Sequence, residues 1–219
     1  MTVPRAFIPF RSRSSRRGVL LATMGCLIAG LLAGCADILP GNTPKLFILT
    51  PKNTYDADLP KVPWQLLVEQ PDAPLSLDTT RIALQNSPTT IDYFANAAWT
   101  DRAPIMVQRL LIESFENTGK ITAVGRDAVG LRADYVLKTD LRDFEADYTD
   151  PNAPPTVRVR LVVRLVKMPE RQIVGEWGDT QRATASVNST DAIIYAFDEA
   201  LGAAMKRVVQ WTLRSGSPS

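Results

Sequence analysis

The hydrophobic pattern is clearest over residues 156–167, where apolar and polar side chains alternate along TVRVRLVVRLVK. Successive side chains of a strand point to opposite faces, so this segment predicts a strand with one face on a core and the other in water. The apolar face carries Val157, Val159, Leu161, Val163 and Leu165, and the polar face carries Arg158, Arg160 and Arg164.

Shorter apolar runs, separated by proline, glycine and Asn-Ser breaks, predict further strands. These strands are expected over residues 65–69, 80–84, 90–94, 121–124, 135–144 and 172–183. Two segments instead repeat their apolar residues at helical spacing, and they cover residues 103–118 and 190–213. For the first of these helices, Asp101 suits the N-cap, Pro104 the first turn and Gly119 the position after the end.

The order of these elements is strands, helix, strands, helix. It predicts an α+β fold with a single antiparallel or mixed β-sheet and two main helices packed on one face. The folded domain is expected to span residues 64–214, and the polar tail 215–219 is expected to be disordered.

The N-terminal 34 residues combine five arginines, no acidic residue and an uncharged apolar run, which is typical of a secretory signal. The end of that run, Leu32-Ala33-Gly34-Cys35, resembles the lipobox of bacterial lipoproteins, in which cleavage falls before a cysteine that is then acylated. The resemblance implies that Cys35 is lipidated and begins the mature chain. Ordinary cleavage nearby, leaving a free thiol, is the alternative. Sec and twin-arginine export both stay open.

Residues 35–63 are interrupted by five prolines and are expected to form a lipidated tether. The run 45–49 is its only strand-like part and is a candidate for a short edge strand. A flexible tether of this length reaches about 30 Å, which spans a headgroup layer and not the periplasm. Because Asp37 does not directly follow Cys35, the sorting pattern favours the outer membrane, with the domain on the periplasmic side.

Charge and composition exclude several functions. Removal of residues 1–34 leaves 20 Lys and Arg against 23 Asp and Glu, so the basic excess that nucleic-acid binding needs is absent. The chain has no histidine, and its two cysteines are Cys26 in the signal and Cys35. Catalysis by Ser-His or Cys-His pairs is therefore excluded, and thiolate or imidazole metal sites are not expected. No cofactor is predicted.

Two groups of residues are candidates for partner or lipid contact. Arg158, Arg160 and Arg164 line one face of a strand, but the neighbouring strand carries Asp140, Asp143, Glu145 and Asp147. Ion pairing across the strands is therefore the favoured interpretation, and a pair of catalytic carboxylates in this acidic group is the weakest one. Tyr93, Phe94 and Trp99 form an aromatic segment that suits an acyl chain, although aromatic residues more often belong to a core.

The folded part resembles the ABC-type transport auxiliary lipoproteins, whose relatives include the paraquat-inducible protein C type. The resemblance runs from about Trp64 to Leu213 and is carried by DTTRI at 78–82, IDYFANAAWTDRAP at 91–104, ADYVL at 133–137 and LRDFEA at 141–146, together with the closing helix. It implies a protein without catalytic residues that works beside an ABC or MCE-type lipid transporter.

The leading hypothesis is thus a non-enzymatic transport accessory that is held at the outer membrane by its lipid anchor. Its expected partners are MCE-domain or ABC transporter proteins and phospholipid, and a homo-oligomer stays open. The alternative is a structural envelope lipoprotein that braces an assembly without touching lipid.

Overall fold

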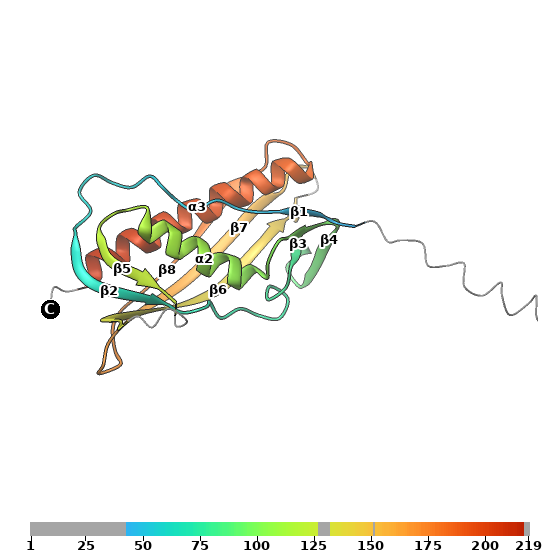
Figure 1. Ribbon diagram of the computed structural model, residues 1–219. Helices are drawn as coiled ribbons and strands as arrows, with labels where there is room; N and C mark the ends of the chain where they lie inside the picture. Colours follow the sequence, from blue (N-terminus) through green and yellow to red (C-terminus); the bar gives the residue numbers. More distant parts are fainter. Residues whose placement is uncertain (1–42, 127–131, 151, 217–219) are drawn as a thin grey trace, which may run out of the picture. The chain divides into compact units, whose positions relative to one another are not determined.

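The structure is a computed structural model that describes residues 43–126, 132–150 and 152–216. These residues form one mixed sheet of eight strands and two helices, α2 and α3 (Figure 1). The strands are β1 (Lys45–Phe47), β2 (Val62–Val68), β3 (Arg81–Ser87), β4 (Thr90–Trp99), β5 (Ile121–Gly125), β6 (Tyr135–Asp147), β7 (Thr156–Lys167) and β8 (Gln172–Thr184). The predicted α+β class and mixed sheet are confirmed.

Strand β6 is the centre of the sheet. One of its edges pairs antiparallel with β7 along almost its whole length, and β7 pairs antiparallel with β8. Its other edge is shared by β2 and β3, which both run parallel to it. Beyond these two strands, β5 pairs with β2, and β4 and then β1 continue from β3.

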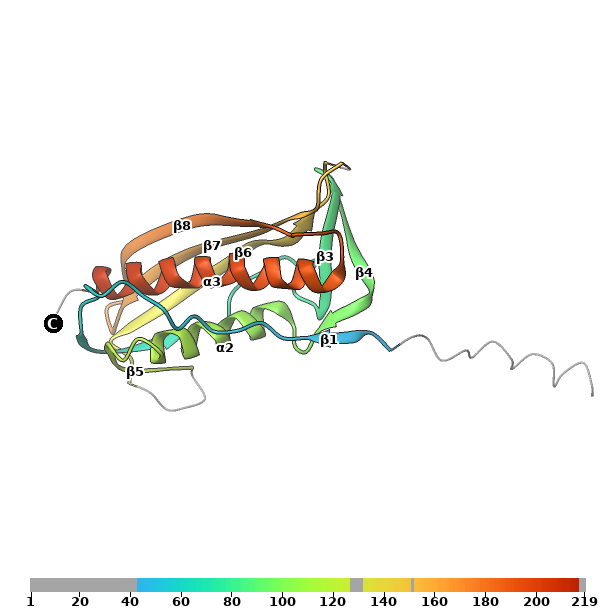
Figure 2. The ribbon, with the colours of Figure 1, turned by 90° about the horizontal axis from the view of Figure 1, so that it is seen from above.

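Both helices cover the same face of this sheet (Figure 2). α3 (Thr190–Ser215) lies against β7 and β8, and α2 (Ala103–Glu116) lies against β2, β5 and α3. The alternation predicted for β7 is confirmed, because its five odd-numbered apolar residues are all buried under the helices. A cluster of three aromatic rings joins α3 to the sheet. The centroid of the Phe197 ring lies 5.2 Å from that of Trp99 and 5.1 Å from that of Phe144.

The predicted tether is too long. The described chain is part of the folded unit from Pro44 onward, and the candidate edge strand is β1, which pairs parallel with β4 at one end of the sheet. The segment after β1 is fixed to the helices, since the Lys52 N–H donates to Ser114 Oγ at 2.9 Å and the Tyr55 hydroxyl to the Ser114 carbonyl at 2.7 Å. Burial raises the pKa of Tyr55 to about 12.

Two predicted boundaries are also wrong. α2 has Arg102 rather than Asp101 at its N-cap, without a side-chain hydrogen bond, although a proline occupies its first turn as expected. α3 continues to Ser215, inside the predicted disordered tail, and Gly216 lies so close to the Trp64 ring that a Cβ atom there would stand 2.4 Å from it. Residues 217–219 lie outside the described residues.

Candidate functional site: the open face of the sheet

Four apolar side chains form a row straight across the face of the sheet that the helices leave open. The strand register places Leu67 of β2 beside Val136 of β6, Val136 beside Val166 of β7, and Val166 beside Ile173 of β8. Side chains alternate along each strand, so these residues point away from the main core, which holds their neighbours Leu66 and Leu137. We call these four residues the apolar row.

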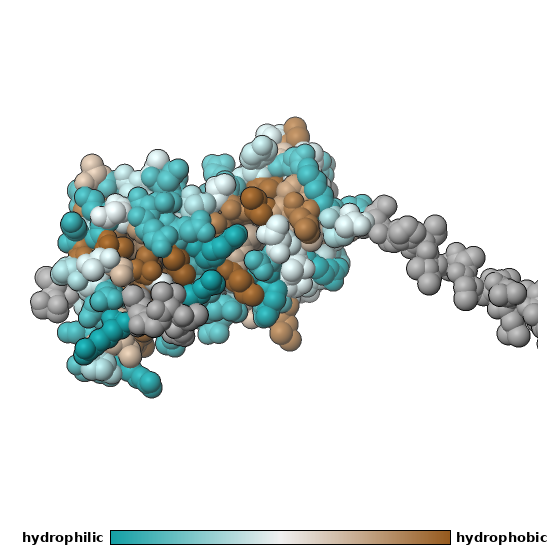
Figure 3. Space-filling view, viewed as in Figure 1, coloured by the Kyte–Doolittle hydropathy of each residue, from teal (hydrophilic) through white to brown (hydrophobic). Residues whose placement is uncertain are grey.

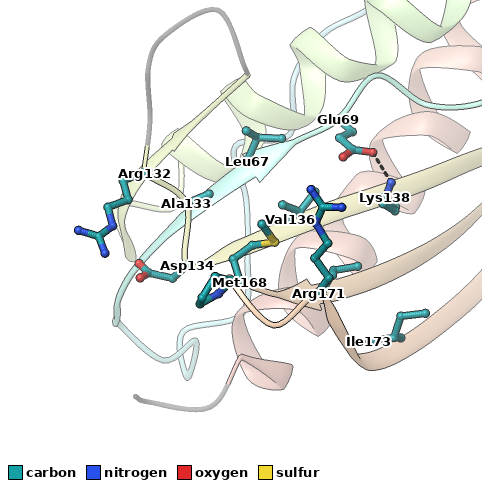
Figure 4. Close-up of a pocket in the computed structure, with 12 residues that line it drawn as sticks. Leu67, Glu69, Arg132, Ala133, Asp134, Val136, Lys138, Met168, Arg171 and Ile173 are labelled. Carbon is teal, nitrogen blue, oxygen red and sulfur yellow. Dashed lines mark hydrogen bonds and ion pairs between the residues drawn. The ribbon is translucent and has the colours of Figure 1, made fainter.

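The apolar row is the floor of a cavity of about 810 Å³. Met168 and Ala133 extend the apolar lining, and both contact the row. The turn between β7 and β8 supplies Arg171, and Figure 4 shows its side chain extended over the row, whereas Arg132 points away. The volume and the mainly apolar lining are typical of a small-molecule site.

The cations at this cavity differ in their pairing. Lys138 Nζ lies 2.8 Å from Glu69 Oε2, so its charge is already compensated (Figure 4). Arg171 and Arg132 make no ion pair with any residue that the structure describes. The carboxylate of Asp134, the other charged group in the lining, accepts the Gln65 backbone N–H at 2.8 Å. The cavity therefore offers an unpaired guanidinium above an apolar floor, an arrangement that suits an amphiphile with an anionic group.

The predicted arginines lie on the same open face, between the cavity and the far end of β7. Arg164 pairs with Glu176 at 2.9 Å and with Asp140 at 3.3 Å. Arg158 pairs with Glu145 at 2.6 Å and lies 3.6 Å from Asp143 and 3.5 Å from Asp147. The ion-paired interpretation is confirmed for these two arginines. Arg160 is exposed and forms no ion pair within the described part of the chain.

Glu145 is the one carboxylate of this network that is almost fully buried, with 3% of its surface exposed. Burial raises its pKa, although the Phe144 N–H, at 2.6 Å, and Arg158 both stabilise the charged form. The cation that faces Glu145 is in direct contact with it, and the two residues are opposite each other on paired strands. This geometry favours a structural pair over a catalytic acid.

The aromatic candidates do not form one site. Trp99 is buried in the core against Phe144 and Phe197. The ring of Tyr93 lies under the Arg81 guanidinium, 3.6 Å from it, and its hydroxyl donates to the Ser76 carbonyl. Phe94 is half-buried, with its ring 6.4 Å from that of Tyr148. The structure thus spreads the three residues over separate environments on β4.

The cavity itself was missed from the sequence. Its floor comes from four strands whose register is set only in the folded sheet, so no local pattern shows it. One signal was present, because Val162 and Val166 stand on the face of β7 that otherwise carries arginines. Both are buried, and Val166 belongs to the apolar row.

Within residues 43–126, 132–150 and 152–216, no group of three or more acidic, cysteine or histidine side chains is placed to hold a metal ion. Over the same residues, neither helix has the length and the apolar character that a bilayer crossing requires. Leu32, Ala33, Gly34 and Cys35 lie outside the described residues.

Comparison with known proteins decides the family. The model of a family described as the ABC-type transport auxiliary lipoprotein component matches residues 48–209, which is most of the chain. The chain belongs to this family of auxiliary lipoproteins. The resemblance noted on the 91–104 segment and the closing helix is confirmed, and the family supports an association with a transporter.

The auxiliary lipoprotein has relatives of known sequence and structure. It is 31% identical to a protein of Xanthomonas campestris whose crystal structure aligns over 78% of this chain and 96% of that one, with a TM-score of 0.75. It is also 29% identical over 195 residues to an uncharacterised protein of Bradyrhizobium diazoefficiens. That match covers 84% of this chain and 50% of the relative, so the auxiliary lipoprotein spans half the length of that protein.

Proposed function

We propose that this auxiliary lipoprotein is a non-enzymatic component of an ABC/MCE-type phospholipid transport system, anchored to the outer membrane on its periplasmic side. The observation that carries the proposal is the apolar row beneath the unpaired Arg171. An acyl chain lies against the row, and the phosphate of the same lipid meets the guanidinium. Burial of apolar surface provides the affinity, and the charge-assisted hydrogen bonds orient the headgroup.

The proposed anchor is the acylated Cys35. The signal motif Leu32-Ala33-Gly34 places cleavage directly before it, and family membership in the auxiliary lipoproteins supports an anchor of this kind. Since the folded unit begins at Pro44, only residues 36–43 are left as a linker. A flexible chain of eight residues has a typical end-to-end distance of about 15 Å. The domain therefore stays at the membrane, and an MCE-domain or ABC transporter protein is proposed to cover the remaining distance.

Loss of lipid contact is expected for Ile173→Glu. Ile173 is exposed at the end of the apolar row, so the fold tolerates the change. A carboxylate at this position would lose its hydration against an acyl chain, which disfavours lipid binding. Native mass spectrometry of wild-type protein extracted from membranes should show a species heavier than the acylated chain by the mass of one phospholipid. The bound fraction should fall several-fold in Ile173→Glu.

Val174→Glu is the matched control, because Val174 is the next residue, is also exposed and does not line the cavity. Equal lipid retention in both variants would contradict the assignment of the cavity. A wild-type protein without bound phospholipid would favour the alternative of a structural envelope lipoprotein.

Cys35→Ser is expected to abolish incorporation of labelled palmitate and to release the exported protein from the membrane fraction. The physical reason is that membrane affinity depends on the number of buried CH₂ groups, at about 0.8 kcal/mol for each. Affinity purification from membranes with the anchor intact should recover an MCE-domain or ABC transporter protein. Palmitate labelling that persists in Cys35→Ser would refute the anchor, and an eluate without such a transporter protein would refute the proposed partner.

A further inference from the structure

Exposed apolar side chains gather where the described chain begins. Leu46 and Ile48, in and directly after β1, are 60% and 63% exposed. Tyr195 of α3 is 77% exposed, and Val187, in the turn before α3, is 56% exposed. Figure 3 shows hydrophobic surface over β1 and the start of α3. We call the surface formed by these four side chains the exit patch; it consists of Leu46, Ile48, Val187 and Tyr195.

Polar contacts place β1 and the residues that follow it beside the first turns of α3. Lys45 Nζ lies 2.7 Å from Asp191 Oδ1, and the Thr50 N–H donates to Asp198 Oδ1 at 2.7 Å. On a helix, residues three and four apart share a face, so Tyr195 stands between these two aspartates. The chain from Lys45 to Thr50 therefore runs along this face of α3, and Leu46 and Ile48 lie beside Tyr195.

Burial alternates along residues 46–49, which shows that the exit patch is the outward face of this segment and not an exposed part of the core. Phe47 and Leu49 point inward, and both contact the main core. Leu46 and Ile48 alternate with them and point outward. Of the two aspartates beside the exit patch, Asp191 is ion-paired with Lys45, whereas Asp198 accepts hydrogen bonds from Thr50, which carries no charge. Apolar burial is therefore the main attraction that this surface offers to a bilayer.

We propose that the exit patch lies in the surface of the bilayer that holds the lipid anchor. This inference rests on the proposed acylation of Cys35. For a flexible chain as long as residues 36–43 the typical end-to-end distance is about 15 Å, so the outward side chains of β1 are the part of the domain nearest to the headgroup level. Leucine, isoleucine and valine enter the acyl boundary, and tyrosine suits the interface because its ring is apolar and its hydroxyl is polar.

Such a contact fixes the orientation of the domain as well as its distance from the membrane. The β7–β8 hairpin, which carries Arg171, lies at the opposite end of the folded unit from β1 (Figures 1 and 2). With the exit patch in the bilayer, the cavity on the open face is directed away from the anchoring membrane and toward a partner. The anchor then holds the domain upright rather than leaving it to rotate freely on its linker.

Spin labels at single cysteines test this orientation, since acylated Cys35 leaves no other thiol in the mature chain. Ile48→Cys reports on the exit patch, and Val174→Cys on the β7–β8 end is the matched control, because both replace an exposed β-branched residue. The full acylated chain is reconstituted into vesicles of phosphatidylcholine and phosphatidylethanolamine. The label at 48 should become several-fold less accessible to a water-soluble nickel relaxant and more accessible to oxygen than the label at 174.

The outcomes separate this inference from the anchor on which it rests. If the protein floats with the vesicles but both labels stay equally accessible to nickel, the anchor stands and the bilayer contact is wrong. If the label at 48 is protected without vesicles and shows spin–spin broadening, a second copy of the chain covers the exit patch and the inference is overturned. If the protein does not float, the anchor fails and the inference fails with it.

Discussion

Phe197→Ala is expected to lower the free energy of unfolding by about 4 kcal/mol, the largest loss for any single change considered. Phe197 is fully buried, and its ring packs edge-on against those of Trp99 and Phe144. Truncation removes the contacts that join α3 to β4 and β6 and leaves a cavity that these rigid rings fill poorly. Urea denaturation of the mature protein measures the loss.

Tyr195→Ala is the control for this variant, because Tyr195 lies half a turn away on the same helix and is 77% exposed. A change at such a site is expected to stay within about 0.5 kcal/mol. If Phe197→Ala does not fold, Phe197→Leu, which keeps part of the volume, should show an intermediate loss. Equal stability of Phe197→Ala and Tyr195→Ala would contradict the aromatic core.

Arg158→Met is expected to destabilise the protein by about 3 kcal/mol near neutral pH, because it leaves the buried Glu145 carboxylate without its cation. The effect depends on pH. Burial already raises the pKa of Glu145 in the folded protein, so between the unfolded and the folded pKa the folded state binds more protons. Stability therefore falls as pH rises through this window. Removal of Arg158 raises the folded pKa further, so the loss should be smaller at about pH 5 than at about pH 7.

Arg160→Met is the matched control, since Arg160 stands two residues away on the same face, is exposed and has no ion pair within the described residues. Its effect should remain within about 0.5 kcal/mol. Adding Glu145→Gln to Arg158→Met should recover part of the loss, because a neutral amide still accepts the Phe144 N–H. A loss in Arg158→Met that does not change with pH would refute the role of the buried charge.

Local pattern was sufficient for most of the fold. The alternation along 156–167 predicted β7 and both of its faces, since the five apolar residues and the three arginines lie where the period of two places them. The two helices were predicted within a few residues because their apolar stripes are long and uninterrupted. In these segments the local preference and the tertiary environment agree.

Prediction failed where distant contacts decide the structure. Residues 50–63 have no hydrophobic period, but Leu59 and Val62 are buried singly and the Thr50 N–H donates to Asp198. The cavity was missed for the same reason, because Leu67, Val136, Val166 and Ile173 become neighbours only through the register of four strands. The arginines were predicted correctly as ion-paired in two cases, since their partners lie on adjacent strands joined by a short connection.

The placement of β1 has a consequence for how the protein is made. A ribosome releases the N-terminus first, and Thr50 must wait for Asp198, 148 residues later. β1 likewise has no partner until β4 has been synthesised. The segment from β1 to Thr50 is thus synthesised long before its partners, as an unpaired strand, and it cannot complete its contacts until α3 has been made. We expect a holding chaperone to recognise this segment, and its docking to mark completion of the domain.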